Sequence, residues 1–522
     1  MTIAEAFEIA FAAHRQPGRE AEAAEMLRQI LAADVGDADV WHQLGMTAHQ
    51  AGWNEAAVGF FSRAVAIAPK SAVLFSNLGN MLAAVGRMEE GVAACKRAIK
   101  LQPDYAEAHN NLGIALGKLD RNAQAVEAFR KAVKLRETYA DAHSNMGNTL
   151  ALLGRLEEAI AAYQRALELK PDYANASFNL GFALGQFGRY GEARAACRRA
   201  VELDPAHTLA DFTRALYHLV EGQFEEGLPL YEARWETPEF TSPRRNFSQP
   251  MWDGSPLNGR TLLIHAEQGF GDSIQFIRYA MLAAGRGGQV IVEAPAPLLE
   301  VFSTGEGIGQ LVPQGEALPH FDLHIPMMSL PLAFGTTLQT IPQSVPYLSA
   351  NAPRCAFWRE WLAKNDAPLK VGLVWAGRPT HTGDRQRSMH LRQWLPIFRV
   401  QGVDFVSLQF DRGIEQIAQL PGRQPICDAS ADIHDFADTA ALISQLDLVI
   451  AVDTAVAHLA GALGKPVWVL VPFAPDWRWM LQREDSPWYP TMRLFRQQRV
   501  GEWDPVIAKV RGELQALVHS RY

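Results

Sequence analysis

The stretch AEAHNNLGIALGKLDRNAQAVEAFRKAVKLRETY (residues 106–139) is followed at once by ADAHSNMGNTLALLGRLEEAIAAYQRALELKPDY (residues 140–173). The two segments align without a gap over 34 residues each, and a glycine recurs at this step at Gly45, Gly79, Gly113, Gly147 and Gly181. An alanine column follows the same step at Ala64, Ala98, Ala132, Ala166 and Ala200. This period indicates a solenoid of stacked units, each too small to bury its apolar face alone.

The period and the residue pattern resemble those of tetratricopeptide repeats, in which each unit is a pair of antiparallel helices. Small residues let the paired helices approach, and proline ends most units because it cannot continue a helix. The pattern predicts regular repeats over residues 38–207, a degenerate cap over 4–37 and a terminal helix pair over 208–236. Together these form a first domain of residues 1–237.

One asparagine per repeat lies on the first helix of its unit, at Asn77, Asn111, Asn145 and Asn179. Amides both donate and accept hydrogen bonds, so such a row can hold an extended peptide. The row resembles the asparagine ladder of the eukaryotic O-GlcNAc transferase, and it predicts binding of a peptide or acceptor. Asparagine is also common at this position of the repeat consensus, where it supports packing, so both interpretations remain open.

Composition narrows the class of protein. The chain has 49 basic and 57 acidic side chains and a net charge of −8, which argues against a nucleic-acid binder or a polybasic membrane patch. Its four cysteines are far apart, which excludes a disulfide scaffold or a cysteine-rich zinc site. No apolar run approaches the length of a membrane helix, and the N-terminus does not resemble a signal peptide. A soluble, cytoplasmic protein is expected.

The second half alternates strand-like and helix-like segments, which predicts parallel sheets covered by helices. Two such sets predict two Rossmann-like lobes, over residues 238–350 and 351–522. Strands are expected at 261–265, 289–294, 369–377, 404–409, 447–452 and 466–471, and helices at 273–286, 391–399, 438–446 and 454–463. Ligands of open α/β sheets bind beyond the carboxyl ends of strands, so we expect the functional residues there.

The segment HAEQGFGDSIQFIRY follows the first of these strands and leads into a helix. Asp272 lies at the start of that helix. It can cap the helix by accepting a backbone N–H, or act as a general base at the mouth of a cleft.

The loop VWAGRPTHTGDRQRSMHL follows the strand at 369–377 and is rich in arginine. Arginine forks match phosphate oxygens and a hydroxyl adds a donor, so the loop is a candidate phosphate site; a solvated charged loop is the alternative. Its candidate residues are Arg378, Asp384, Arg385, Arg387 and Ser388, to which the end of the next strand adds Gln409.

The segment VDTAVAHLAGALGKP places Asp453 and Thr454 where a strand meets a helix. The backbone N–H groups of Ala455 and Val456 would form an anion site at that helix N-terminus, with His458 one turn further on. A plain helix cap and a core histidine are the alternatives.

The last candidate segment, VPFAPDWRWMLQREDSPWYPTMRLFRQ, combines tryptophans with charged residues, including Asp476 and Arg478. Aromatic faces suit stacking on a sugar or a base, and a packed interdomain surface is the alternative. The second half contains no phosphate-loop, zinc-protease or D-x-D motif. A cationic loop and a helix N-terminus can neutralise a diphosphate leaving group without a metal.

These four segments, in this order, resemble the ADP-heptose:lipopolysaccharide heptosyltransferase family of glycosyltransferases. The whole chain resembles bacterial proteins that fuse tetratricopeptide repeats to such a domain. The resemblance implies a GT-B fold, inversion at the anomeric carbon, Asp272 as the base in an acceptor-side first lobe, and a nucleotide-sugar in the second. Ala455 replaces the family's usual glycine, and the family's donor-phosphate lysine has no counterpart, so an arginine of the loop would have to replace it.

The sequence therefore predicts an inverting, metal-independent glycosyltransferase that needs no cofactor beyond its nucleotide-diphosphate sugar. A protein or glycan acceptor would be recruited by the repeats, which can also support a homo-oligomer. The alternative is a non-catalytic tetratricopeptide scaffold with a degenerate glycosyltransferase domain.

Overall fold

The computed structural model describes residues 3–521 except 15, 17–18, 20–21, 24, 27–28, 31–35, 239, 365–366, 380–382, 411 and 423–425. Much of the predicted cap after residue 14 lies outside the described residues. The chain divides into two compact units, Met1–Pro205 and Ala206–Tyr522. The boundary precedes the expected one at residue 237, so the predicted terminal helix pair belongs to the second unit.

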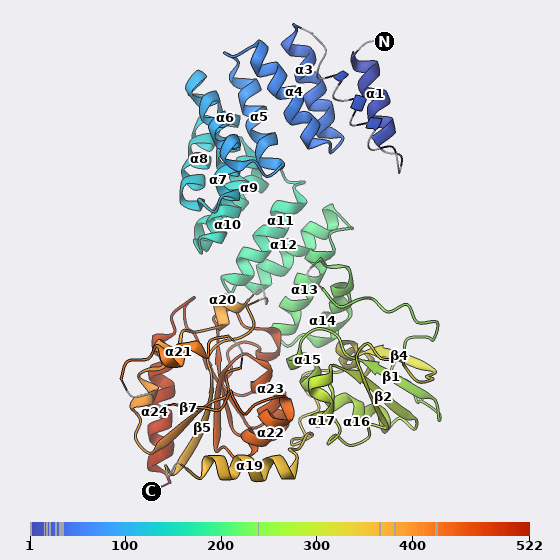
Figure 1. Cartoon of the computed structure of the whole chain (residues 1–522), viewed down its shortest axis with the longest axis vertical. Helices are drawn as coiled ribbons and strands as arrows, with labels where there is room; N and C mark the ends of the chain where they lie inside the picture. The colour runs from blue at the N-terminus through green and yellow to red at the C-terminus, as the bar shows by residue number, and fades with distance from the viewer. Residues whose placement is uncertain are drawn as a thin grey trace. The chain divides into compact units, whose positions relative to one another are not determined.

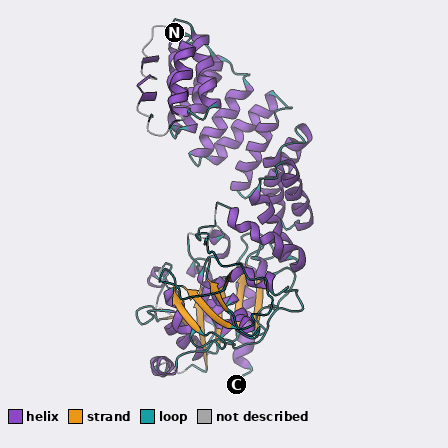
Figure 2. Cartoon of the chain, turned by 90° about the vertical axis from the view of Figure 1, so that its right-hand side faces the viewer, coloured by secondary structure: helices purple, strands orange, loops and turns teal. Residues whose placement is uncertain are grey.

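The first unit is a stack of helical hairpins, as the 34-residue period predicts, and Figure 2 shows strands only in the second unit. Its helices are α1 (Ile3–His14), α3 (Ala38–Gln50), α4 (Asn54–Ile67), α5 (Ala72–Ala84), α6 (Met88–Leu101), α7 (Ala106–Lys118), α8 (Asn122–Leu135), α9 (Ala140–Leu152), α10 (Leu156–Leu169), α11 (Ala174–Gln186) and α12 (Tyr190–Leu203) (Figure 1). Buried alanines fill the space between paired helices, together with one aromatic residue in three of the units (Phe61, Phe129 and Tyr163) and a cysteine in the other two (Cys95 and Cys197).

The repeated glycine is required by the close approach of the two helices in each unit. A Cβ added at Gly113 would lie 2.6 Å from Phe129 Cε1, and one at Gly147 would lie 2.7 Å from Tyr163 Cε1. No side chain fits there without moving the buried ring.

We expect Gly113→Ala to destabilise the repeat unit, because overpacking costs about 1–3 kcal/mol and outweighs the gain of about 1 kcal/mol in helix propensity. Gly117→Ala is the matched control in the same helix, since no atom lies within 4 Å of its added Cβ. That variant should gain stability. Urea denaturation of both variants tests this, and equal effects would contradict the packing account.

The second unit begins with helices α13 (Thr208–Val220) and α14 (Phe224–Tyr231) and the 3₁₀ turn η1 (Glu232–Glu236). Phe224 and Tyr231 each pack at 6.0 Å, centroid to centroid, against Trp477 in the turn η6 (Trp477–Trp479) of the far C-terminal lobe. These aromatic contacts explain why the helix pair joins the α/β unit.

The first lobe contains a four-stranded parallel sheet in the order β3-β2-β1-β4. Its strands are β1 (Thr261–His265), β2 (Gln289–Ala294), β3 (Gln310–Pro313) and β4 (Leu323–Pro326). Its helices are α15 (Phe270–Phe276), α16 (Arg278–Ala284), α17 (Leu299–Phe302) and α18 (Leu330–Ala333), with turns η2 (Ala296–Leu298) and η3 (Met327–Ser329). The helix expected over 273–286 is therefore two helices, separated at Ile277.

The second lobe contains a six-stranded parallel sheet in the order β10-β9-β8-β5-β6-β7. Its strands are β5 (Leu369–Val374), β6 (Val403–Ser407), β7 (Ile426–Asp428), β8 (Leu448–Val452), β9 (Val467–Val471) and β10 (Met492–Arg496). Its helices are α19 (Ala352–Leu362), α20 (Asp384–Arg387), α21 (Glu415–Ala418), α22 (Phe436–Ser444), α23 (Ala455–Ala462) and α24 (Asp504–His519), with turns η4 (Leu391–Trp394) and η5 (Ile397–Arg399) in place of the helix expected at 391–399.

Each sheet has a switch point, where the strand order reverses beside its first strand. In the first lobe this lies between β1 and β4, and in the second between β5 and β8. The loops that leave two such strands diverge and open a crevice at the carboxyl edge, where open α/β sheets bind ligands. The candidate segments of the sequence follow β1, β5, β8 and β9, so the topology brings three of them to these two edges.

Candidate functional site

The arginine-rich loop after β5 reaches the switch point of the second lobe. Ser388 Oγ donates to Asp384 Oδ1 at 2.8 Å and accepts the N–H of Gly377 at 2.8 Å, which folds the loop back on itself. Arg387 is largely buried, and its Nε lies 3.5 Å from the same carboxylate oxygen. Arg385 is exposed. The loop therefore directs Arg387, rather than all of its arginines, inward.

Thr454 precedes helix α23 on the other side of this crevice. Its extended backbone starts the helix, and its carbonyl accepts the N–H of Ala457 at 3.0 Å. The N–H groups of Ala455 and Val456 precede this first helical bond and point out of the helix end. The Thr454 hydroxyl is buried and has no hydrogen-bond partner in the described structure. This end of α23 can therefore offer several donors to an anion.

Two carboxylates of the second lobe, Asp453 and Asp476, lie near one another at this edge. Burial raises the pKa of Asp453 to about 6, and the nearby Asp476 carboxylate adds to the rise while Arg387 opposes it. Burial also disfavours the charge of Asp476, but Arg478 outweighs it and lowers the pKa of Asp476 below its ordinary value. At neutral pH one carboxylate is firmly charged and the other is close to its titration range.

His458 lies one turn into α23 and is buried. Burial, reinforced by the cation of Arg478, lowers the pKa of His458 to about 3, so the ring is neutral at physiological pH. Its Nδ1 lies 3.0 Å from the Tyr489 hydroxyl, and its Nε2 lies 3.9 Å from Asp453 Oδ1. A Cβ added at Gly271 would lie 3.1 Å from this ring, so the glycine lets the first lobe approach α23.

Asp272 both caps a helix and forms an ion pair across the two lobes. Asp272 is not the N-cap residue that the sequence suggested but the third residue of α15, and its Oδ2 reaches back to accept the N–H of the N-cap residue Gly269 at 3.0 Å. Its Oδ1 accepts a hydrogen bond from Arg478 Nη2 at 2.5 Å. Arg478 Nη1 lies 3.0 Å from Asp476 Oδ1, so one guanidinium joins the carboxylates of both lobes.

Other predicted residues have different surroundings. Gln409 is buried; its Oε1 accepts the N–H groups of Trp375 and Ala376, each at 3.1 Å, and its Nε2 donates to Ala376 O and Arg412 O. These four bonds use the whole side-chain amide within the loop. Arg378 is exposed, and its guanidinium lies 5.3 Å from the Phe270 ring centroid of the first lobe.

The switch point of the first lobe holds a buried ion pair that the sequence reasoning missed. Arg234, from η1, donates to Glu267 Oε1 and to Ser329 Oγ, each at 2.7 Å. Glu267 also accepts the N–H of Met328 at 3.0 Å. Burial raises the pKa of Glu267 to about 7 although Arg234 opposes the rise. The position of Glu267 directly after β1 was a signal for it, but nothing in the sequence pointed to Arg234.

The asparagine column lies on the first helices of the repeats, and each amide bonds to the preceding repeat. Asn111 Nδ2 donates to Ser76 Oγ at 3.0 Å, Asn145 Nδ2 to Asn110 Oδ1 at 3.1 Å, and Asn179 Nδ2 to Asn148 Oδ1 at 2.9 Å. Asn77 Nδ2 lies 2.9 Å from His42 Nε2. These bonds match the packing interpretation, and peptide binding by the remaining amide groups stays a prediction.

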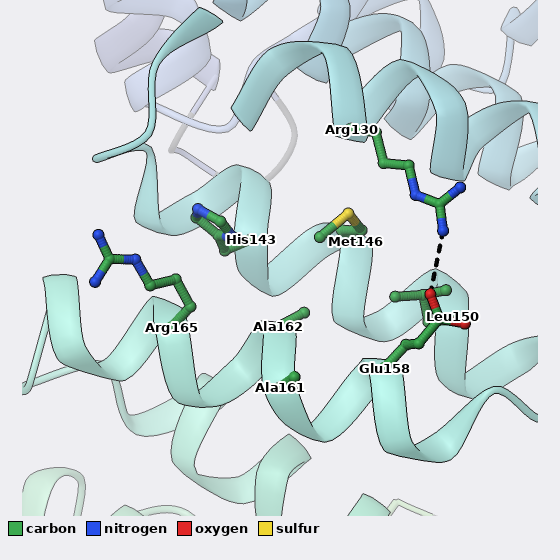
Figure 3. Close-up of a pocket in the computed structure, with 8 residues that line it drawn as sticks. All are labelled: Arg130, His143, Met146, Leu150, Glu158, Ala161, Ala162 and Arg165. Carbon is green, nitrogen blue, oxygen red and sulfur yellow. Dashed lines mark hydrogen bonds and ion pairs between the residues drawn. The ribbon is translucent and has the colours of Figure 1, made fainter. Parts of the chain in front are cut away.

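The repeat unit also contains a pocket of about 310 Å³ among α8, α9 and α10, which the sequence reasoning did not foresee (Figure 3). Its floor is apolar, with Met146, Leu150 and two alanines, while Arg165 and His143 lie at one end. At the other end Arg130 pairs with Glu158 at 3.1 Å. The asparagine column does not line this pocket.

In the described residues, no helix is both long and apolar enough to cross a membrane. The same residues hold no group of three or more His, Cys, Asp and Glu side chains placed to bind a metal ion.

Family models match segments in both halves of the chain. Models of the tetratricopeptide repeat match residues 38–71, 71–138, 147–188 and 174–207. The model of glycosyltransferase family 9 (heptosyltransferase) matches residues 432–470, which include Asp453, Thr454 and His458. The chain thus combines a tetratricopeptide solenoid with an α/β unit of two parallel sheets that is consistent with the GT-B type.

Among curated proteins, Protein FlbA of Caulobacter vibrioides is 29% identical over 334 residues. The match covers 59% of this chain and 55% of the relative, so the chain spans about half the length of that protein. Among solved structures, the tetratricopeptide protein YrrB, described as having an unusual peptide-binding site, is 24% identical over 33% of this chain and 89% of its own, with a TM-score of 0.30. TTC0263 of Thermus thermophilus is 24% identical over 35% of this chain and 100% of its own, with a TM-score of 0.32.

Proposed function

We propose that the α/β unit is an inverting glycosyltransferase that binds a nucleotide-diphosphate sugar at the switch point between β5 and β8 and works without a metal. The observation that carries the proposal is that Arg387 and the N-terminus of α23 both lie at this switch point, where the cation of Arg387 acts on the Asp453 carboxylate. The match of residues 432–470 to a glycosyltransferase model supports it independently. The repeats would recruit the protein or glycan that supplies the acceptor hydroxyl.

The chemistry follows from where the charges lie. The acceptor oxygen bonds to the anomeric carbon from the first lobe, while the bond from that carbon to the diphosphate oxygen breaks on the side of the second lobe. Asp272 takes the hydroxyl proton, and the electron pair leaves on the diphosphate. Arg387, Arg478 and the N–H groups of α23 would stabilise that developing charge, as an oxyanion site does.

A screen of protein melting against ADP-, UDP-, GDP- and dTDP-sugars, each with and without EDTA, tests donor binding. We expect one nucleotide to raise the melting temperature by several degrees, since a ligand that binds only the folded state stabilises it. The shift should persist in EDTA. No shift with any donor would favour a scaffold without turnover, and a shift that EDTA abolishes would overturn metal independence.

The pKa of Asp453 gives this binding a pH dependence. Its pKa of about 6 means that the carboxyl is charged at pH 8 and neutral at about pH 5. A diphosphate is repelled by the charged form, so donor affinity should rise as pH falls through this range. A nucleotide-sugar is a suitable probe because its diphosphate diester keeps its charge throughout.

Calorimetric titration of wild type and Asp453→Asn with the selected nucleotide-sugar measures this effect. The amide cannot ionise, so the variant should bind at both pH values with the affinity that wild type reaches only in acid. Affinity that falls on acidification, or an equal pH dependence in the variant, would contradict the assignment.

A further inference from the structure

Arg478 is held by carboxylates from both lobes, one of which is the proposed base. Its side chain is only 7% exposed, and its guanidinium lies 4.7 Å from the Trp477 ring centroid and 5.4 Å from that of Phe276. Within this aromatic setting it contacts Asp272 on one side and Asp476 on the other. The aromatic rings thus lie beside the guanidinium, while its N–H groups donate to the two carboxylates.

The charges around this guanidinium do not balance. Asp272 and Asp476 share one cation, and Arg478 Nε is buried without a hydrogen-bond partner among the described residues. A diphosphate that approaches α23 adds further negative charge beside these carboxylates. Phosphate oxygens accept paired hydrogen bonds from a guanidinium as well as a carboxylate does. The diphosphate and Asp272 can therefore exchange as partners of Arg478.

Backbone strain lies beside both members of the pair. Gln268, four residues before Asp272, has a φ of +63°, and Met480, two residues after Arg478, has a φ of +54°. For residues other than glycine such angles are unfavourable and persist only where surrounding contacts impose them. Surrounding contacts therefore impose the conformation of both loops beside the ion pair.

We propose that Asp272 and the diphosphate of the donor compete for Arg478, so that binding of the donor releases Asp272 to accept the acceptor proton. The inference rests on the proposed function, because it assigns a regulation to that site. While Arg478 occupies Asp272 Oδ1 and Gly269 N–H occupies Oδ2, both carboxylate oxygens are engaged. When the guanidinium of Arg478 donates to the diphosphate instead, Asp272 Oδ1 becomes free to accept a proton, and this happens only when a donor is bound.

If Asp272 and the diphosphate compete for Arg478, removal of the Asp272 charge should tighten donor binding. A purely structural role of Asp272 does not predict this result. We expect Asp272→Asn to bind the nucleoside diphosphate about five- to tenfold more tightly than wild type, in the lower range of measured couplings between sites. Asparagine can still accept the Gly269 N–H, so the helix cap is retained. Asp272→Ser is a second variant that keeps a cap and lacks the charge.

The experiment is a calorimetric cycle with ADP, UDP, GDP and dTDP as probes, on wild type, Asp272→Asn, Arg478→Gln and the double variant. Arg478→Gln should weaken binding about tenfold, and Asp272→Asn should have no effect in that background. Asp253→Asn, an exposed carboxylate of the same lobe, controls for a general change of charge.

Equal or weaker binding by both Asp272 variants, with a wild type that binds, would overturn the competition and leave the proposed function standing. Tighter binding that persists in the Arg478→Gln background would overturn it as well, because Arg478 would not be the shared partner. Failure of every probe to bind wild type and variants would overturn both proposals.

Discussion

Replacing Asp272 by Asn is expected to lower the rate of sugar transfer by about 10²–10⁴-fold, the usual contribution of a general base. The amide keeps the hydrogen bond to Gly269 N–H, so the fold of the loop and donor binding should survive. Release of the nucleoside diphosphate from the nucleotide-sugar measures the effect, because water can take the place of the acceptor hydroxyl. Stopped assays at saturating donor then report turnover rather than affinity.

The control for this variant is Asp253→Asn, which removes an exposed carboxylate far along the chain from the proposed base. Its turnover should equal that of wild type. Turnover by Asp272→Asn within about twofold of wild type would remove Asp272 from the reaction, because a base contributes far more than that. The helix cap and the ion pair with Arg478 would then be its whole role.

Arg234→Met is expected to destabilise the α/β unit by about 3–5 kcal/mol, the cost of leaving a buried charge without its partner. Arg234 and Glu267 each have a side chain that is 1% exposed, and Arg234 also binds Ser329. The unpaired Glu267 carboxylate can become neutral by taking up a proton. The loss of stability should therefore be smaller at about pH 5 than at pH 8. Urea denaturation at both pH values measures it.

Two variants make this second prediction specific. Arg244→Met breaks an ion pair with Glu236 in the same segment, but both side chains are more than half exposed, so it should change stability by less than about 1 kcal/mol. Glu267→Gln added to Arg234→Met removes the unpaired charge and should restore part of the lost stability. Equal losses for Arg234→Met and Arg244→Met would contradict the assignment of a buried pair.

Much of the fold could be predicted because its signals are periodic or local. The 34-residue step fixes the repeats, and apolar runs mark strands such as Thr261–His265, whose bounds agree with the expected ones. Strand β7 has only three residues, and β10 contains two arginines among apolar side chains inside a segment interpreted as aromatic and cationic. The break at Ile277 splits a helix whose apolar pattern continues through it.

Part of the candidate site could likewise be predicted from the local sequence, and part could not. The placement of Thr454 and Arg387 could be predicted from the ends of the strands that precede them, because position after a strand is a property of the local sequence. The contact between Asp272 and Arg478 joins residues 206 apart in the chain, and the one between Arg234 and Glu267 joins residues 33 apart. No local pattern encodes such pairs. The first pair forms when the two lobes pack together and the second when η1 packs on the first lobe, and both decide which charges are balanced.

Calorimetric titration of wild type, Arg387→Met and Arg392→Met with a nucleotide-sugar tests whether the donor binds at the switch point between β5 and β8. Arg387 is largely buried beside the crevice, whereas Arg392 is an exposed arginine of the same lobe. We expect saturable binding to wild type and to Arg392→Met, and at least about tenfold weaker binding to Arg387→Met, the loss expected for one charge-assisted contact. Equal affinity of all three proteins would place the donor elsewhere and contradict the account.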